Sequence, residues 1–293
     1  MPQSPRPLFS LIMPTYNADH LLDRTWPEVL DFVRAKGGTW EAIYVCDGCS
    51  DGSDRELERR VAALPDDVAG LVRVIRYKRN RGKGYAVRLG MLRARGQYRV
   101  FTDVDLAYRL DMVETLGEQL AGGLDVVVAS RAHRESEVVM ADGMGGYVKC
   151  RKLQSLAFSK IARLILGVRQ HDPQAGLKGL SARAANGILR YVRCYGFGFD
   201  CDLLVACRYL GIPVREVPVR VVYDGLPSTT KLSSSVRMIR ELWAIRKRWQ
   251  RIGREGLEEN VLAAAEPPVN AREDGDIPTS AEFTPDAERP GDG

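Results

Sequence analysis

The chain has 293 residues, of which 45% are hydrophobic and 28% are charged, an ordinary composition for a soluble globular protein. No apolar run approaches the ~18 residues that a membrane span needs, and the first seven residues hold no apolar signal region. Six cysteines in a chain of this length do not make a disulfide framework. We therefore expect a folded, cytoplasmic protein in a reducing compartment, and not a disordered, exported or disulfide-scaffolded one.

The net charge of +5 conceals an asymmetry along the chain. Residues 255–293 carry a net −9, which leaves +14 for residues 1–254. A basic body suggests an anionic partner such as nucleic acid, an anionic membrane surface or a phosphorylated substrate. The segment 255–293 has few large apolar residues and much Pro, Gly and acid, so we predict an acidic disordered tail that aids solubility.

Strands and helices are predicted to alternate over the first 130 residues. Short apolar runs predict strands at Phe9–Met13, Trp40–Cys46, Leu71–Tyr77, Tyr98–Thr102 and Asp125–Ala129. Helical spacing predicts helices between them, at Leu21–Arg34, from Ser53 to before Pro65, at Lys83–Arg95 and at Asp111–Leu120. This alternation predicts an α/β fold whose mainly parallel sheet is covered by helices on both faces. Ligands of such sheets bind beyond the carboxyl ends of the strands, where the unusual polar clusters of this sequence lie.

The second of these helices has a start signal of its own. Ser53 and Glu56 stand three residues apart before the helical run, which is the spacing of a capping box. We therefore expect Ser53 to be the N-cap of this helix.

Two carboxylates follow the fourth predicted strand, at Asp103 and Asp105. Residues two apart can converge once a strand has ended, and paired carboxylates beside a diphosphate suit Mg²⁺ or Mn²⁺. The alternative interpretation is an ordinary turn or helix N-cap, because Asp is common after strands.

A basic glycine-rich segment, Asn80-Arg-Gly-Lys-Gly84, comes directly before the third predicted helix. Glycines let the backbone approach a ligand closely, and a helix N-terminus favours phosphate. The spacing is not that of a P-loop, and a plain loop is the alternative. Together with the carboxylate pair, this segment predicts a site for a metal ion and a nucleoside diphosphate.

The chain resembles the inverting glycosyltransferases of family 2. Pro14-Thr-Tyr-Asn17, Cys46-Asp-Gly-Cys-Ser-Asp-Gly-Ser53, the segment 80–84 and Asp103-Val-Asp105 are similar to motifs of that family, in the same order and at the same spacing. Later segments narrow the resemblance to the branch that charges dolichyl or other polyprenyl phosphates with one sugar. These are Ala129-Ser-Arg131, His171-Asp-Pro-Gln-Ala-Gly-Leu-Lys178, Gly198-Phe-Asp-Cys-Asp-Leu-Leu204 and Glu216-Val-Pro-Val219.

The resemblance implies an A-type glycosyltransferase fold with a Rossmann-like nucleotide-binding half. It implies that Pro14, Tyr16 and Asp47 hold the base and ribose of a nucleotide-sugar donor. Asp103 and Asp105 would position Mg²⁺ or Mn²⁺ on the diphosphate, with Arg81 and Lys83 near that charge. The metal would act as a Lewis acid on the leaving nucleoside diphosphate.

The acceptor side is implied by the later segments. The family assigns this zone to Asp172, with Arg131 and Lys178 as contacts of the acceptor phosphate, and Asp200 and Asp202 as second choices for a catalytic carboxylate. A hydroxyl acceptor needs a base, whereas a phosphate acceptor is already an anion and needs mainly positioning. Taken alone, Asp172-Pro173 also fits a turn.

Three positions depart from the family pattern: Ala18, the Cys46–Cys49 segment and Leu177. The first two lie at the nucleotide end, so they bear on the donor base more than on the chemistry. Cys46 and Cys49 have the spacing of a zinc or redox pair, but no second Cys/His pair has ligand spacing, so we do not expect a metal there.

Val236–Arg254 has apolar residues at helical spacing, with two tryptophans and seven basic residues. Such a helix suits an anionic membrane interface, and it equally fits a helix whose apolar face packs on the domain. Nucleic acid is not expected, because no stacking platform or groove-reading motif accompanies the charge.

These expectations define a cytoplasmic enzyme, peripheral on the inner membrane face, with a catalytic domain at residues 7–230, a basic amphipathic helix at 231–254 and a tail at 255–293. It would move one hexose from a nucleotide sugar, UDP-glucose or another UDP-hexose, to polyprenyl phosphate. The alternatives are the same chemistry on a soluble hydroxyl acceptor and an inactive regulatory protein that binds nucleotide sugars. The oligomeric state is left open.

Overall fold

A computed structural model describes residues 6–140, 157–196, 198–223 and 233–255. The expected junction between catalytic domain and basic helix, at 230–231, lies outside these ranges, and so does the predicted tail beyond Glu255.

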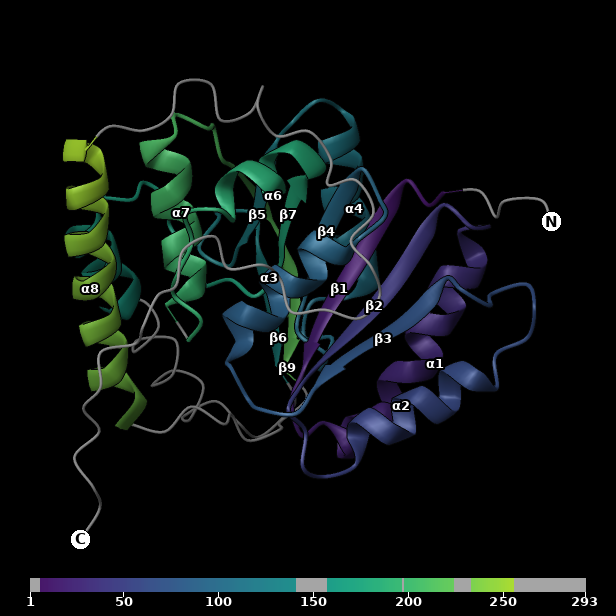
Figure 1. The fold of residues 1–293 in the computed structure, drawn as a ribbon. Coiled ribbons are helices and arrows are strands. Elements are labelled where there is room, and N and C mark those ends of the chain that lie inside the picture. The colour runs from purple at the N-terminus through teal and green to yellow at the C-terminus, as the bar shows by residue number, and fades with distance from the viewer. Residues whose placement is uncertain (1–5, 141–156, 197, 224–232, 256–293) are drawn as a thin grey trace, which may run out of the picture.

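The core of the fold is a seven-stranded sheet in the order β3-β2-β1-β4-β7-β5-β8 (Figure 1). Five of these strands were predicted: β1 Phe9–Thr15, β2 Trp40–Asp47, β3 Val72–Tyr77, β4 Tyr98–Phe101 and β5 Val126–Ser130. Neighbours among β3, β2, β1 and β4 run parallel, and β5 runs parallel to β8 (Arg215–Pro218). The unpredicted β7 (Lys178–Ser181) lies antiparallel between β4 and β5. The prediction of a mainly parallel α/β sheet is confirmed, with one antiparallel strand inserted.

Helices cover both faces of this sheet (Figure 1). One face carries α1 (Asp19–Ala35), α2 (Ser53–Ala62) and α4 (Leu110–Ala121). The other carries α3 (Lys83–Arg93), α6 (Ala182–Ile188), α7 (Phe199–Tyr209), α8 (Ser233–Glu255) and the helical residues 157–166. Side chains alternate between the two cores along each strand, so Ile12 packs with α3 while Leu11 and Met13 pack with α1. Burial on both faces explains why these strands are continuous apolar runs.

A second, two-stranded sheet extends from the carboxyl ends of β5 and β8. β6 (Glu137–Met140) follows β5, β9 (Arg220–Tyr223) follows β8, and the two pair in parallel with Glu137 opposite Arg220. Neither strand was predicted. The pair joins the segment after β5 to the segment after β8 at the end of the main sheet where the polar clusters lie.

The predicted capping box of α2 is wrong. The N-cap is Gly52, in the left-handed region at φ 92°, and it has no side chain with which to cap the helix. Ser53 is already helical, and its backbone N–H and its hydroxyl both donate to Asp51, at 3.0 and 2.6 Å. A carboxylate one residue farther upstream satisfies the helix start instead.

Most of the apolar stripe of α8 packs on the domain, whereas Trp243 is 56% exposed. Leu242 and Trp249 are fully buried, and Ile245 is 2% exposed, in the same core as α7. The indole Nε1 of Trp249 also donates to Asp202 on α7 at 2.7 Å. For this stripe the core-packing alternative is the one that the structure shows. None of the described helices is both long enough and apolar enough to cross a bilayer.

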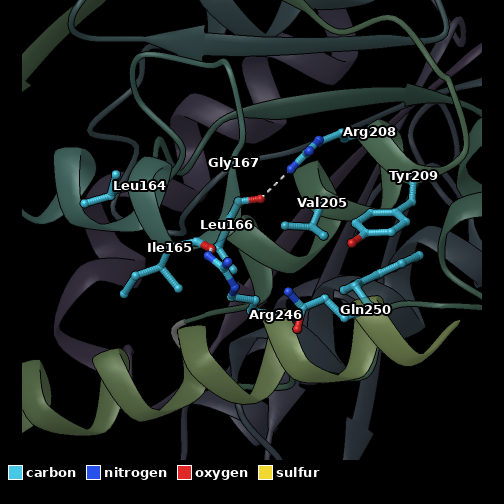
Figure 2. A pocket seen from close by; sticks show the side chains of 10 residues that line it. Leu164, Ile165, Leu166, Gly167, Val205, Arg208, Tyr209, Arg246 and Gln250 are labelled. Carbon is cyan, nitrogen blue, oxygen red and sulfur yellow. Dashed lines mark hydrogen bonds between the residues drawn. The ribbon is translucent and has the colours of Figure 1, made fainter. Parts of the chain in front are cut away.

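A cavity of about 300 Å³ lies among residues 164–167, α7 and α8, away from the ends of the strands (Figure 2). Its two arginines already have partners: Arg208 donates to the carbonyl of Leu166 at 2.8 Å, and Arg246 to that of Ile165 at 2.5 Å. They thus satisfy carbonyls at the end of the helical residues 157–166. No predicted site residue lines this cavity.

Candidate active site

Loops after β2 and β3 interlock through Asp47. This residue ends β2, is 3% exposed, and accepts hydrogen bonds from the backbone N–H groups of Arg81 and Gly82 at 2.6 and 2.9 Å. Gly48 completes the fit, since a Cβ there would lie 2.4 Å from the backbone nitrogen of Asn80. The Asp47 carboxylate therefore shapes the basic glycine-rich loop.

Asp103 lies at the centre of the cluster, just past β4. Lys83, the first residue of α3, places its Nζ 2.6 Å from Asp103 Oδ1. Partial burial lowers the pKa of Lys83, but Asp103, Asp200 and Asp105 outweigh it and raise that pKa above its ordinary value. Lys83 therefore stays protonated. Its ammonium group interacts with carboxylates of two segments, Asp103 and Asp105 after β4 and Asp200 before β8.

Asp105 lies on the exposed side of the same turn. Its Oδ1 accepts the backbone N–H of Ala107 at 3.0 Å, and Arg24 of α1 donates to its backbone carbonyl at 2.8 Å. Desolvation at this crowded strand end raises the pKa of Asp105, and the neighbouring Asp103 carboxylate raises it further. Two mutually repelling carboxylates are thus held at one place.

Asp172 and Arg131 form a buried ion pair beyond the end of β5. Asp172 is 3% exposed and accepts Nε and Nη2 of Arg131 at 2.7 and 2.9 Å, with the Arg131 backbone N–H at 3.1 Å. Burial raises the pKa of Asp172, but Arg131 more than offsets this and holds that pKa below its ordinary value. About a quarter of the Arg131 side chain remains exposed. The pair fixes one edge of a guanidinium while leaving part of it accessible.

Lys178, which the resemblance implied as a contact of the acceptor phosphate, is fully buried. Its Nζ donates to Asp200 Oδ1 at 2.7 Å and to the carbonyl of Ala175. Asp200 lies in the first turn of α7 and is 5% exposed. Lys178 and Asp200 therefore bind the start of β7 to α7 beneath the site.

Gly176 brings the two halves of the site into contact. A Cβ at this position would lie 2.3 Å from Asp103 Oδ2 and 3.6 Å from Lys83 Nζ. The segment that carries Asp172 and Lys178 thus lies directly on the carboxylate after β4. Gly176 and Arg24 were not predicted as site residues: a glycine contact gives no signal in sequence, and Arg24 resembles any exposed helical arginine.

Asp202 lies apart from these residues. It is fully buried and accepts the backbone N–H groups of Arg193 and Cys194, both at 3.0 Å, as well as Trp249 Nε1 and an Arg248 nitrogen. All of these contacts tie α7 to α8 and to the loop before α7. These contacts indicate that Asp202 stabilises the packing of α7 and α8.

The segment after β1 is open to solvent. Tyr16 is 53% exposed, and Asn17 adopts a left-handed φ of 49° while its Oδ1 accepts the backbone N–H of Ser50 at 2.8 Å. Pro14 lies within β1, paired with Val45 of β2. Tyr16 therefore stands beside the loop after β2 with an accessible ring.

Cys46 and Cys49 lie at the same strand end. Interaction with the neighbouring Cys46 thiol lowers the pKa of Cys49 to about 6, although burial opposes this shift, and the same interaction raises the pKa of Cys46. Within the described ranges, no group of three or more His, Cys, Asp or Glu side chains is arranged to hold a metal ion. A divalent cation would have Asp103 and Asp105 as its protein ligands, and needs further oxygens from its substrate or from water.

Comparison with known proteins finds relatives over most of the chain. The family model described as glycosyl transferase family 2 matches residues 10–164. The chain is 30% identical over 253 residues to a dolichyl-phosphate beta-glucosyltransferase of Drosophila melanogaster, covering 83% of this chain and 75% of that protein. The enzyme of the same name from Saccharomyces cerevisiae is 28% identical over 252 residues, covering 81% and 73%.

Solved structures show the same fold. Glucosyl-3-phosphoglycerate synthase from Mycobacterium tuberculosis in complex with UDP gives a TM-score of 0.56 at 20% identity, covering 85% of this chain and 82% of that one. The same enzyme with Mn²⁺, UDP and glucosyl-3-phosphoglycerate gives 0.55 at 20% identity, covering 85% and 81%.

Proposed function

We propose that this chain, which belongs to glycosyl transferase family 2 and has the predicted A-type fold, transfers one hexose from a UDP-sugar to a polyprenyl phosphate. The observation that carries the proposal is the contact between the Asp103–Lys83 pair and the segment that bears Asp172, at Gly176. Relatives named dolichyl-phosphate beta-glucosyltransferase support the lipid phosphate as acceptor, and a fold relative holding UDP supports the donor.

On the donor side, the loop 80–84 would take the diphosphate. Asp47 orients the backbone of Arg81 and Gly82, and Lys83 adds a protonated amine. Tyr16 and Pro14 lie at the adjacent strand end, where a base and ribose would extend. When the bond between the sugar and the diphosphate breaks, the negative charge on the leaving group is stabilised by Lys83.

The residues also fit a divalent cation, Mg²⁺ or Mn²⁺. Carboxylate oxygens are the ligands that these ions prefer. Desolvation and the neighbouring Asp103 carboxylate both raise the pKa of Asp105, and a bound cation would favour its charged form. Asp103 and Asp105 would hold the ion, which would supply Lewis-acid stabilisation of the diphosphate. A fold relative with Mn²⁺ and UDP supports this assignment.

On the acceptor side, we assign Arg131 to the lipid phosphate and Asp172 to holding Arg131. Asp172 is a weak base, because its pKa is lowered and both of its oxygens accept from Arg131. A phosphate oxygen is already an anion at neutral pH, so no base is required. It attacks the anomeric carbon on the face opposite the UDP, the new C–O bond forms as the old one breaks, and the configuration inverts.

The remaining charged residues then have supporting roles. Lys178 and Asp200 hold the segment before β7 against α7, and Asp202 holds α8. We therefore propose that Asp200 and Asp202 act through the fold and not on the reacting atoms. On the same basis, the catalytic domain extends through β9 and uses α8 as part of its core.

We also propose that the chain acts on the cytoplasmic face of an anionic membrane, through the outer surface of α8 and the adjoining helical residues 157–166. Of the six exposed large hydrophobic residues in the described chain, Ile161, Leu164 and Trp243 lie on these two helices. On α8, the exposed Arg240 and Lys247 stand three residues before and four residues after Trp243, on the same side of the helix. Apolar side chains among basic ones fit an interface of anionic headgroups.

A donor panel tests the reaction. Release of UDP, and of other nucleoside diphosphates from matched donors, is measured with Mn²⁺ or Mg²⁺, with and without polyprenyl phosphate, and with a soluble phosphorylated or hydroxyl acceptor. We expect release from UDP-hexose that depends on the lipid phosphate. Release that depends only on a soluble acceptor would change the acceptor class, and binding of UDP-sugar without turnover under any condition would favour a regulatory protein.

A further inference from the structure

Glu241 of α8 reaches the start of α7. Its Oε2 accepts the backbone N–H of Gly198, the N-cap residue of α7, at 2.8 Å, and lies 3.7 Å from Cys194 Sγ. A carboxylate at this place satisfies a backbone donor that has no partner within the helix and complements the positive end of the helix dipole. Glu241 therefore anchors the chain on both sides of residues 195–196.

Two glycines make this approach possible. A Cβ at Gly196 would lie 2.5 Å from Glu241 Oε1, and one at Gly198 would lie 3.0 Å from Oε2. A side chain at Gly196 would overlap Oε1 of Glu241, and one at Gly198 would press on both Oε2 and Cys194 Sγ, so both positions favour glycine beside the carboxylate. The loop before α7 is thus fitted closely to one side chain of α8.

The other side of this loop lies against the nucleotide segment. The carbonyl of Tyr195 accepts the backbone N–H of Gly84 at 2.9 Å, and a Cβ at Gly82 would lie 2.3 Å from that oxygen. Gly82 has a φ of 97°, a conformation that side chains disfavour. The rings of Tyr195 and Tyr85 also meet edge to face, with centroids 5.5 Å apart.

The chain of contacts ends in the donor site. Gly82 donates to Asp47, and Lys83, between the two glycines, holds Asp103. The hydrogen bond from Gly84 to the Tyr195 carbonyl therefore helps to fix the position of the Lys83 backbone at the start of α3. Residues 195 and 196 are clamped between Glu241 on one side and this backbone on the other.

We propose that Glu241 is a positioning residue for the donor site. It holds the Tyr195 carbonyl against Gly82 and Gly84, and so fixes the loop that carries Lys83. The inference rests on the proposed donor site, and goes beyond it by giving α8 a part in binding the nucleotide. It involves no contact between Glu241 and substrate.

The test measures UDP binding in the presence of Mn²⁺ by calorimetry on the full chain, with the melting temperature of each variant. We expect Glu241→Ala to weaken UDP binding about tenfold, which corresponds to ~1.4 kcal/mol. Glu241→Gln keeps an oxygen that can accept from Gly198 and should retain most of the affinity. Gln250→Ala, on the exposed side of the same helix, should bind UDP as the wild type does.

The variant Gly196→Ala tests the same contact by changing the loop instead of Glu241. It should weaken UDP binding by a similar factor, because its Cβ displaces the Glu241 carboxylate. If both variants act through one contact, the double variant Glu241→Ala/Gly196→Ala should be no weaker than the worse single variant. Independent effects would multiply to about a hundredfold.

A core variant separates positioning from general stability. Leu242→Ala removes a buried side chain of α8 but keeps the Glu241 carboxylate, so it should lower the melting temperature and leave UDP affinity nearly unchanged. If Glu241→Ala lowers only the melting temperature, or if its effect multiplies with that of Gly196→Ala, the inference is wrong. A wild-type chain that does not bind UDP would overturn the donor site itself, and this inference with it.

Discussion

Arg131 Nε lies 2.7 Å from Asp172 Oδ2, and Arg131 Nη2 lies 2.9 Å from Oδ1, so one guanidinium edge is paired with both oxygens of one carboxylate. Such bidentate pairs fix the plane of the guanidinium. The pairing also uses the oxygens that a general base would need. The geometry therefore favours a role for Asp172 in holding Arg131 over a role in removing a proton.

Variants of this pair should identify the role. We expect Asp172→Asn and Arg131→Ala each to lower kcat/KM for polyprenyl phosphate about 10²-fold, equivalent to ~2.7 kcal/mol. UDP affinity should stay within about threefold, and the double variant should resemble the single ones, because both remove one interaction. Rates are measured from pH 5 to 9. If Asp172 were the base, Asp172→Asn would abolish an acidic limb of the pH profile. Arg131→Ala would keep that limb and move it to higher pH, because Arg131 lowers the pKa of Asp172.

The cation is tested at its two proposed ligands. Asp103→Asn and Asp105→Asn should each lower turnover about 10²–10³-fold and remove the Mn²⁺ dependence of UDP binding, because the neutral amide is a poorer ligand and leaves less charge on the site. Asp111→Asn, an exposed carboxylate in the first turn of α4, is the matched control and should behave as the wild type. Turnover that persists in excess chelator would contradict the metal assignment.

The two tryptophans of α8 should behave differently. Trp249→Ala removes a fully buried ring and its bond to Asp202, so we expect a loss of ~3–5 kcal/mol and a melting temperature lower by roughly 10 °C. Trp243→Ala, at a ring 56% exposed, should leave the melting temperature unchanged and weaken sedimentation with anionic vesicles. Binding should also fall as salt rises. Wild-type chain that does not sediment with anionic vesicles would contradict the membrane surface.

The Cys49 thiol should be unusually reactive. With a pKa lowered to about 6, it is mostly thiolate at pH 7, whereas the pKa of each other described cysteine is raised by burial and neighbouring groups. Alkylation followed by mass spectrometry from pH 5 to 8, in a Cys150→Ser background, should show the Cys49 rate rising with a midpoint near 6. Cys46→Ser removes the thiol partner and should move this midpoint toward ~8.5. A wild-type midpoint already near 8.5 would show that the two thiols do not interact.

Sequence patterns predicted the elements whose signal is local. β1 to β5 are apolar runs bounded by turn residues, and the helices between them keep helical spacing, so their order was found correctly. β7 gave no such signal, because its residues, Lys-Gly-Leu-Ser, are not an apolar run. Its lysine can be buried because Asp200, on helix α7, compensates its charge.

In the candidate site, too, contacts between sequence neighbours could be predicted, and contacts between distant segments could not. Asp103 and Asp105 are neighbours in sequence, so their pairing could be inferred from spacing at a strand end. Arg131 and Asp172 are distant in sequence, and their contact depends on how the segments after β5 and before β7 meet. Periodicity in α8 predicted a helix, but whether Trp249 is buried depends on α7, which periodicity does not reveal.

The position of β7 between β4 and β5 affects how the sheet forms during synthesis and which fragments of the chain can fold. β5 has β7 and β8 as its neighbours, and β4 has β7 on one side, so neither strand is fully paired until residues 178–181 exist. At a synthesis rate of ~5–20 residues per second, the interval between Phe101 and Lys178 is roughly 4–15 s. During that time the nascent chain carries an open strand edge, a template for pairing with other chains. A fragment that stops at residue 164, where the family match ends, keeps this open edge and leaves β5 without a partner, so it is not an independent folding unit.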